Sequence, residues 1–201
     1  MKKYIEDTLK YYDNNSELYY ETWNTTFVSE HNFEIPDIFL SYLKPGAYIL
    51  DCGCGTGRDS VYFKKKGYKV KAIDGSAAMC KIASEALNEV VEQINFLNIE
   101  YTDEFDGIFA CASLLHLNNE DLIDCMKRLI VALKSDGIMY TAFKVGEEER
   151  VKETRFFNDM TLEKFENICK DIPNIEIIKV WENEQYNNHK SFINFIMKKK
   201  N

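Results

Sequence analysis

The sequence predicts an α/β fold, in which a doubly wound, mostly parallel sheet ends in an antiparallel hairpin and is preceded by a helical lid. From residue 47 onward, short apolar runs alternate with amphipathic segments, the pattern of strands and helices in a parallel sheet. Near the end, two strand-like runs are joined by a polar link, 183–190, that is too short for a parallel crossover. Residues 1–44 are polar and tyrosine-rich, which predicts helices outside the sheet.

The helices expected in the first segment are 3–12, 15–23 and 35–43, with Pro36 in a first helical turn. Pro45 and Gly46 then break the chain before the first strand. Five strands, 48–51, 68–73, 91–96, 105–112 and 138–143, alternate with helices 59–66, 77–90 and 120–133. Gly67 ends the first of these helices, and Ser76 is a candidate N-cap for the second. A charged loop, 144–155, and a helix, 162–170, precede the hairpin strands 175–182 and 192–197.

Length and composition fit one soluble domain. The 201 residues are 45% hydrophobic and 29% charged, so we expect a single domain, 1–201, with a lid over 1–44 and a core over 45–201. The net charge of −8 disfavours a nucleic-acid partner, because such proteins present a basic face. The first ten residues are charged throughout and the longest apolar runs are strand-sized. We therefore expect a cytoplasmic location and no membrane partner.

The six cysteines, at 52, 54, 80, 111, 125 and 169, are expected to be small buried hydrophobes. In a chain without an export signal, an even number of cysteines is weak ground for disulfides. Cys52 and Cys54 are separated by one residue, too close for the usual pair of zinc ligands, and no second pair follows. No metal site is therefore predicted.

The densest chemical signal is the run Ile49-Leu-Asp-Cys-Gly-Cys-Gly-Thr-Gly57. A strand runs into three glycines, and a helix follows directly. Glycine permits a sharp turn and lets a ligand approach the backbone, while the start of the helix offers free N–H groups. Asp51 places a carboxylate at the strand end, where it can hold a cationic amine. The alternative is a tight turn that binds no ligand.

A second carboxylate, Asp74, ends the second strand about twenty residues beyond the first glycine, where it can accept hydrogen bonds from both hydroxyls of a ribose. The alternative is a capping role for helix 77–90, for which Ser76 competes. The G-x-G-x-G spacing at 53–57 is tighter than the G-x-G-x-x-G fingerprint of dinucleotide sites. The tighter spacing is common in sites for S-adenosylmethionine (SAM), although these two signals alone do not separate NAD from SAM.

Three runs carry a resemblance to the class I SAM-dependent methyltransferases. They are Asp51-Cys-Gly-Cys-Gly-Thr-Gly-Arg-Asp-Ser60, Gly67-Tyr-Lys-Val-Lys-Ala-Ile-Asp-Gly-Ser76 and Phe105-Asp-Gly-Ile-Phe-Ala-Cys-Ala-Ser-Leu-Leu-His116. Within that class, the chain is similar to the tellurite-resistance-like and type 11–12 small-molecule group, and its opening helix resembles theirs at 11–15 and 20–22. The resemblance covers roughly 11–160. It implies a Rossmann-like, seven-stranded fold and SAM as cofactor.

The resemblance also implies roles for matching positions. The methionine part of SAM would be lined by Asp51, Gly53 and Gly55, and its carboxylate covered by Arg58, Tyr11 and Tyr20. The ribose would be met by Asp74 and flanked by Gly75 and Ser76, and the sulfonium would lie over Ala110 and Cys111. Asn98 stands where the family usually has an acid that meets the adenine amino group, and its side-chain carbonyl can accept the same bond. Cys54 and Ile99 are also expected among the cofactor contacts.

Methyl transfer is an in-line displacement at a sulfonium carbon, so the protein mainly aligns the acceptor and excludes water. A base is needed only if the acceptor must first lose a proton. His116, after the fourth strand, is the candidate catalytic residue, and the alternative is a histidine bonded to backbone at a helix entry. Lys144, Arg155 and Phe156 frame the loop after the fifth strand, a common place for substrate contacts.

The leading hypothesis is a methyltransferase that acts on a small molecule, because the surface is acidic, the chain is short and no recognition domain is appended. The alternatives are methylation of RNA or protein, an NAD-binding oxidoreductase, and a SAM-binding protein without chemistry. The oxidoreductase would need a second domain or a catalytic Tyr-x-x-x-Lys pair, and we expect neither. The sequence predicts neither the accepting atom nor the oligomeric state.

Overall fold

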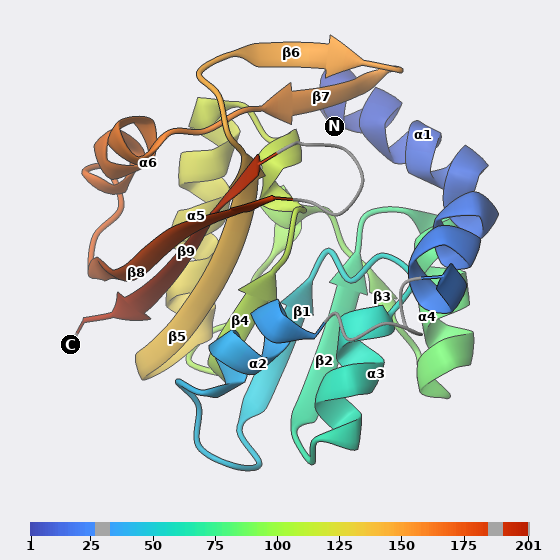
Figure 1. Cartoon of the computed structure of the whole chain (residues 1–201), viewed down its shortest axis with the longest axis horizontal. Helices are drawn as coiled ribbons and strands as arrows, with labels where there is room; N and C mark the ends of the chain where they lie inside the picture. Colours follow the sequence, from blue (N-terminus) through green and yellow to red (C-terminus); the bar gives the residue numbers. More distant parts are fainter. Residues whose placement is uncertain (27–32, 185–190, 201) are drawn as a thin grey trace.

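The computed structural model describes residues 1–26, 33–184 and 191–200, and it has the expected layered α/β architecture (Figure 1). A seven-stranded sheet has the order β3-β2-β1-β4-β5-β9-β8. Its strands are β1 Tyr48–Cys52, β2 Lys69–Asp74, β3 Glu92–Gln93, β4 Phe105–Ala110, β5 Leu133–Lys144, β8 Ile175–Glu184 and β9 Ser191–Lys199. The first five run parallel, whereas β9 pairs antiparallel with both β5 and β8. The predicted doubly wound sheet with a C-terminal antiparallel strand is confirmed.

Helices cover both faces of the sheet, because neighbouring residues of each buried strand point in opposite directions. Ile49 packs with Phe39 and Phe63 on the face covered by α2 Glu34–Leu40 and α3 Arg58–Lys65. Leu50 packs with Leu129 on the face covered by α5 Asn119–Ala132, and α6 Leu162–Cys169 lies on that face too. Helix α4 Ala77–Leu87 lies beside α3. Both faces of the central strands are thus apolar, as expected for a parallel sheet.

The N-terminal segment forms one long helix, α1 Lys3–Tyr20, followed by a π-helical turn, η1 Glu21–Thr26. Separate helices over 3–12 and 15–23 were expected. That boundary is wrong, and a tertiary contact of Asp13 supports the continuous helix. The Asp13 carboxylate accepts hydrogen bonds from the Ser76 hydroxyl at 2.6 Å and the Ala78 backbone N–H at 3.1 Å.

The third strand is shorter than the expected 91–96. It ends at Gln93 and is followed by a 3₁₀ turn, η2 Phe96–Asn98. The Asn95 side chain accepts a hydrogen bond from the Leu97 backbone N–H at 2.9 Å. Asparagine competes with the strand ladder in this way, and the chain turns instead of extending.

The segment 144–155 was expected to be a loop, but Lys144 ends strand β5 and the part from 149 onward enters a hairpin of β6 Glu149–Lys152 and β7 Arg155–Asn158. The two turn residues, Glu153 and Thr154, both have positive φ, 51° and 69°. A two-residue turn of this kind is usually signalled by Asn-Gly or Asp-Gly, and the sequence lacks that signal here. Figure 1 shows this hairpin and α1 on the same side of the molecule.

Among the described residues, no helix is both long and apolar enough to cross a membrane. Helix α1, with 18 residues, reaches the necessary length, but charged and polar side chains recur along all of it.

Candidate functional site

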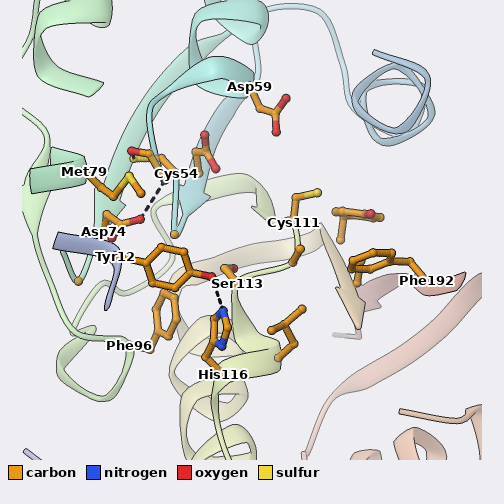
Figure 2. A pocket seen from close by; sticks show the side chains of 18 of the residues that line it. Tyr12, Cys54, Asp59, Asp74, Met79, Phe96, Cys111, Ser113, His116 and Phe192 are labelled. Atoms are coloured by element: carbon orange, nitrogen blue, oxygen red, sulfur yellow. Dashed lines mark hydrogen bonds between the residues drawn. The ribbon is translucent and has the colours of Figure 1, made fainter. Parts of the chain in front are cut away.

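A cavity of about 850 Å³ lies at the carboxyl ends of the parallel strands, beneath α1 and the β6–β7 hairpin. The strand order divides its wall into two sides. The side over β1, β2 and β3, here called the β2 side, is formed by Asp51, Gly53, Gly55, Asp74, Met79, Asn95 and Phe96. The side over β5, β8 and β9, here called the β5 side, is formed by Tyr140, Ala142, Lys144, Arg155, Phe157, Trp181, Phe192 and Asn194. Figure 2 shows Asp74 and Met79 across this space from Phe192. Ligands bind at this edge of open α/β sheets.

The turn after β1 leaves room for a ligand only because its residues are glycines. Gly53 has φ of 81°, and a Cβ added there would stand 2.5 Å from the Ser113 Cβ. Gly55 also has positive φ, 56°, and the space around its Cα is open. A side chain at either position would be strained, and at Gly53 it would also clash. The backbone is therefore bare where the cavity meets the start of α3.

Asp51 is a buried carboxylate, 3% exposed, at the end of β1. It accepts a hydrogen bond from the Ser60 hydroxyl at 2.5 Å. Burial raises the pKa of Asp51 to about 7, with the nearby Asp59 adding to the effect. A cation entering the cavity would relieve both causes, because it would stabilise the ionised carboxylate.

Asp74 is fixed by backbone N–H groups on two sides. One of its oxygens accepts from the Gly55 N–H at 2.9 Å and the other from the Ser76 N–H at 2.8 Å, and Figure 2 marks the former bond. Burial raises the pKa of Asp74 while these bonds lower it. Each oxygen keeps a lone pair for a further donor in the cavity, which suits a pair of vicinal hydroxyls. Ser76 caps α4 as predicted, since its hydroxyl accepts from the Met79 N–H.

One face of α1 covers part of the cavity. Ile5, Thr8, Leu9, Tyr12 and Tyr19 line it, and they are spaced at multiples of a helical turn. Trp23 of η1 continues the same face.

The structure places the predicted lid residues Tyr11 and Tyr20 outside this lining. Tyr11 lies against Arg155, with the guanidinium carbon 4.0 Å from the ring centroid, and Tyr20 is 40% exposed. Tyr12 and Tyr19 were not predicted to contact a ligand, although the helical spacing from Ile5 could have identified them.

His116 ends a 3₁₀ turn, η3 Leu114–His116, and is 9% exposed. Its Nδ1 lies 2.6 Å from the Phe156 carbonyl oxygen, and its Nε2 lies 2.7 Å from the Tyr12 hydroxyl. A carbonyl only accepts, so Nδ1 carries the proton and Nε2 accepts from Tyr12, the bond marked in Figure 2. Burial, followed by the cations Arg155 and Lys144, lowers the pKa of His116 to about 4. The imidazole is therefore neutral with both nitrogens occupied.

Other predicted cofactor residues fall into two groups. Cys54, Arg58, Gly75 and Cys111 line the cavity, whereas Ser76, Asn98, Ile99 and Ala110 do not. Ile99 and Ala110 are core residues, and Asn98 is exposed in η2. Asn98 was placed at the end of a full-length third strand, and the early 3₁₀ turn moves it away and brings Asn95 and Phe96 to the cavity instead. Arg58 forms a two-bond ion pair with Asp59, at 2.9 and 3.0 Å.

The β5 side is aromatic and carries positive charge. Lys144 and Arg155, expected from their place after the fifth strand, both line it. Phe156 does not, because its ring packs on Tyr4 and only its carbonyl reaches His116. The contributions of the last two strands, namely Trp181, Phe192 and Asn194, were not predicted.

Across the described ranges, no group of three or more His, Cys, Asp or Glu side chains is arranged to hold a metal ion. Cys52, Cys80 and Cys125 are buried, as expected, and Cys54, Cys111 and Cys169 are partly buried; all six thiols are free.

Comparisons with known sequences agree with this geometry. Residues 49–137 match a family model described as a methyltransferase domain. An uncharacterized methyltransferase of Staphylococcus carnosus is 28% identical over 155 residues, which cover 72% of this chain and 73% of that protein. A ribosomal protein L11 methyltransferase of Dictyoglomus thermophilum is 31% identical over 156 residues, 74% of this chain but 44% of that longer protein.

Solved structures share the fold over nearly the whole chain. The 1,6-didemethyltoxoflavin-N1-methyltransferase of Burkholderia thailandensis, crystallised with 1,6-didemethyltoxoflavin and S-adenosylhomocysteine, superposes with a TM-score of 0.81 at 16% identity, covering 98% of this chain and 89% of that one. A TehB-like SAM-dependent methyltransferase of Corynebacterium glutamicum superposes with a TM-score of 0.72 at 21% identity, covering 93% and 99%.

Proposed function

Because this chain belongs to the class I SAM-dependent methyltransferases, we propose that it transfers the SAM methyl group to a small molecule bound on the β5 side of the cavity. The observation that carries the proposal is that α1 and the β6–β7 hairpin cover part of the cavity and contribute Tyr12, Tyr19 and Arg155 to its wall. The volume of about 850 Å³ is at the upper end of the range for small-molecule sites, roughly 300–1,000 Å³. The Burkholderia thailandensis enzyme, whose name specifies a small acceptor, supports the same substrate class.

We propose that the β2 side holds the cofactor, and its chemistry fits each part of SAM. The buried Asp51 carboxylate meets the methionine ammonium, and the bare backbone at Gly53 and Gly55 admits the methionine chain. The two outward lone pairs of Asp74 accept from the ribose hydroxyls. When bound, SAM supplies a methyl group that is already activated by the sulfonium.

We assign the adenine to the pocket beside Asn95 and Phe96 rather than to Asn98, because the first two line the cavity and Asn98 does not. The Phe96 ring offers an apolar surface to a base, and the Asn95 amide is a polar group at its edge. The resemblance to the family suggested the third strand end for this role, and the early 3₁₀ turn shifts the role by two or three positions.

The residues around the acceptor favour alignment over proton removal. Base catalysis by His116, expected from its position, would require Tyr12 to release Nε2. With the pKa lowered to about 4, holding the imidazolium at neutral pH would also cost ~4 kcal/mol. We therefore propose that His116 fixes the Tyr12 hydroxyl and that the accepting atom reaches the methyl carbon with a free electron pair. The protein then contributes orientation and exclusion of water.

Titration calorimetry with SAM, S-adenosylhomocysteine (SAH) and NAD tests the cofactor assignment. We expect micromolar binding of SAM and SAH, about −8 kcal/mol, and no binding of NAD. Asp74→Ala should raise the dissociation constant ~100-fold, because two hydrogen bonds to a charged acceptor contribute ~3 kcal/mol. Asp171→Ala, at an exposed position just after α6, is the matched control and should bind normally. Binding of NAD without SAM would contradict the cofactor assignment.

A protein acceptor is the second candidate, because the Dictyoglomus thermophilum relative is a ribosomal protein L11 methyltransferase. The two are separated by incubating a cell extract with the chain and SAM labelled in its methyl group. We expect the label in molecules that pass a low-mass filter. Label found solely in acid-precipitable protein would contradict the small-molecule proposal and leave the cofactor assignment intact.

A further inference from the structure

The guanidinium of Arg155 is held from several directions, but its Nε donor is unused. Its side chain is 12% exposed. Nη1 donates to the Tyr19 hydroxyl at 2.6 Å, and Nη2 donates to Glu153 at 2.6 Å. Within the described part of the chain, the buried Nε has no hydrogen-bond partner. A buried donor without a partner is costly, and such groups often mark the place of a ligand.

The carboxylate that pairs with Arg155 lies toward solvent rather than inside the cavity. Glu153 is about half exposed, so water weakens that ion pair. Lys144, at the end of β5, also lines the cavity, with its ammonium 3.9 Å from the centroid of the Phe157 ring. The carboxylate of Glu182 on β8 borders the same side, but its residue is exposed to solvent.

Both cations act on the same space. The Arg155 guanidinium carbon lies 5.3 Å and the Lys144 ammonium 3.9 Å from the centroid of the same Phe157 ring, and both charges lower the pKa of His116. Arg150, on the same hairpin, is different, because Asp159 neutralises it through two bonds at 2.6 and 2.9 Å. Arg155 is thus the buried hairpin cation with a donor to offer.

From this arrangement we propose that the methyl acceptor is an organic anion, whose carboxylate or phosphonate-type group accepts a hydrogen bond from Arg155 Nε and faces Lys144. The inference rests on the proposed function and names its substrate class. The aromatic wall of Phe157, Trp181 and Phe192 accommodates the uncharged body of such an acid. An anionic ligand is favoured here even though the chain carries a net charge of −8, because the cations that line the cavity dominate the local potential.

The competing role for Arg155 is to hold the carboxylate of SAM itself. Arg58 was assigned that role, and its bonds to Asp59 leave the assignment open to a second cation. Binding of SAH separates the two roles, because SAH carries the same methionine carboxylate and needs no acceptor. A residue of the acceptor site can be replaced without loss of SAH, whereas a residue that holds the cofactor carboxylate cannot.

The experiment measures binding of matched acids and amides to the chain saturated with SAH. The probes are benzoate, phenylphosphonate and the neutral benzamide. Their binding is measured by calorimetry or by tryptophan fluorescence, because both tryptophans of the chain, Trp23 and Trp181, line the cavity. We expect at least one acid to bind ~10-fold more tightly than benzamide. The tighter of the two acids identifies the anionic group.

In Arg155→Gln the preference for acids should disappear while the SAH dissociation constant stays within about twofold. Arg155→Lys should keep part of the preference, because it retains the charge but not the guanidinium fork. Lys152→Gln, an exposed cation on the same hairpin, is the matched control and should change neither quantity.

Three results would overturn the inference: equal binding of acids and benzamide, no binding of either acid at millimolar concentration, or loss of SAH binding in Arg155→Gln. Failure of the wild-type chain to bind SAH would instead overturn the proposed function. The two failures are therefore distinguishable.

Discussion

A buried carboxylate that must meet a cation makes ligand affinity depend on pH, and Asp51 is such a group. Its pKa is raised to about 7 by burial, so below that value the unliganded site is protonated and lacks the charge that attracts the SAM ammonium. We expect SAM affinity to fall ~10-fold for each pH unit below about 7, and binding near pH 6 to release about one proton. Calorimetry in buffers of different ionisation enthalpy measures both quantities.

The same pKa shift fixes the sign of the effect on stability. The folded chain binds the Asp51 proton more tightly than the unfolded chain, whose value is near 3.9. Without ligand, this residue therefore adds stability as the pH falls from about 7 to about 4.

Asp51→Asn should remove the pH dependence of SAM binding. A pH dependence that persists in the variant would show that another group causes it.

His116 has the opposite shift. Its pKa is lowered to about 4, below the value of about 6.5 in an unfolded chain, so the unfolded state binds the proton first. We expect this residue to destabilise the fold by up to ~3 kcal/mol as the pH falls from about 6.5 to about 4. An NMR titration should show the imidazole neutral above about pH 5.

The variant His116→Gln should unfold less readily in acid, relative to neutral pH, than the wild type. A methyl-transfer rate with an acidic limb near pH 6.5 that disappears in this variant would contradict the positioning role and restore base catalysis.

At the scale of elements, the lid depends on the contacts that join α1 to α4. Asp13 accepts from the Ser76 hydroxyl and the Ala78 N–H, so it adds an anion to the positive end of α4. Loss of these bonds in Asp13→Ala should raise the population of open lid and weaken SAM binding ~10-fold, because apparent affinity scales with the closed fraction.

The control is Asp7→Ala, since Asp7 pairs with Lys3 within α1. Hydrogen exchange of the α1 amides should quicken in Asp13→Ala and remain unchanged in Asp7→Ala. Equal SAM affinity in both variants would show that this contact does not control closure.

Elements with a local signal could be predicted from the sequence. The signal is local where nearby residues decide the backbone conformation or the end of a helix. This is so for the glycines after β1, the capping Ser76 and the apolar strand runs. These features predicted the parallel sheet and the β2 side of the cavity, and the short link 183–190 predicted the antiparallel finish. Most of the residues predicted to contact SAM therefore lie together in one cavity.

Elements governed by distant contacts could not be predicted in the same way. Asp13 stays helical because of Ser76, which lies far along the chain. The hairpin turn at Glu153 and Thr154 uses residues that rarely adopt positive φ. The β5 side combines the hairpin with the last two strands, so its wall depends on strand order, which the sequence indicates only in outline.

At the scale of the whole molecule, the net charge of −8 should steer the cofactor. SAM carries one positive charge more than SAH, because its sulfur is a sulfonium, and the two are otherwise matched in shape. Opposite charges raise association rates. At 0.1 M ionic strength salt largely screens the attraction between charges that are more than about 10 Å apart. We expect the association rate of SAM to fall several-fold between low and high salt, and that of SAH to change much less.

Stopped-flow fluorescence can measure both rates, because Trp23 and Trp181 lie in the cavity wall. Equal salt dependence of the two association rates would show that the net charge of the protein does not affect the rate at which SAM binds. An association rate for SAM that rises with salt would mean that Arg155 and Lys144 dominate the potential at the entrance. In that case the association rate of SAM with the Arg155→Gln variant should fall with salt, because the substitution removes one of the two cations that repel the sulfonium.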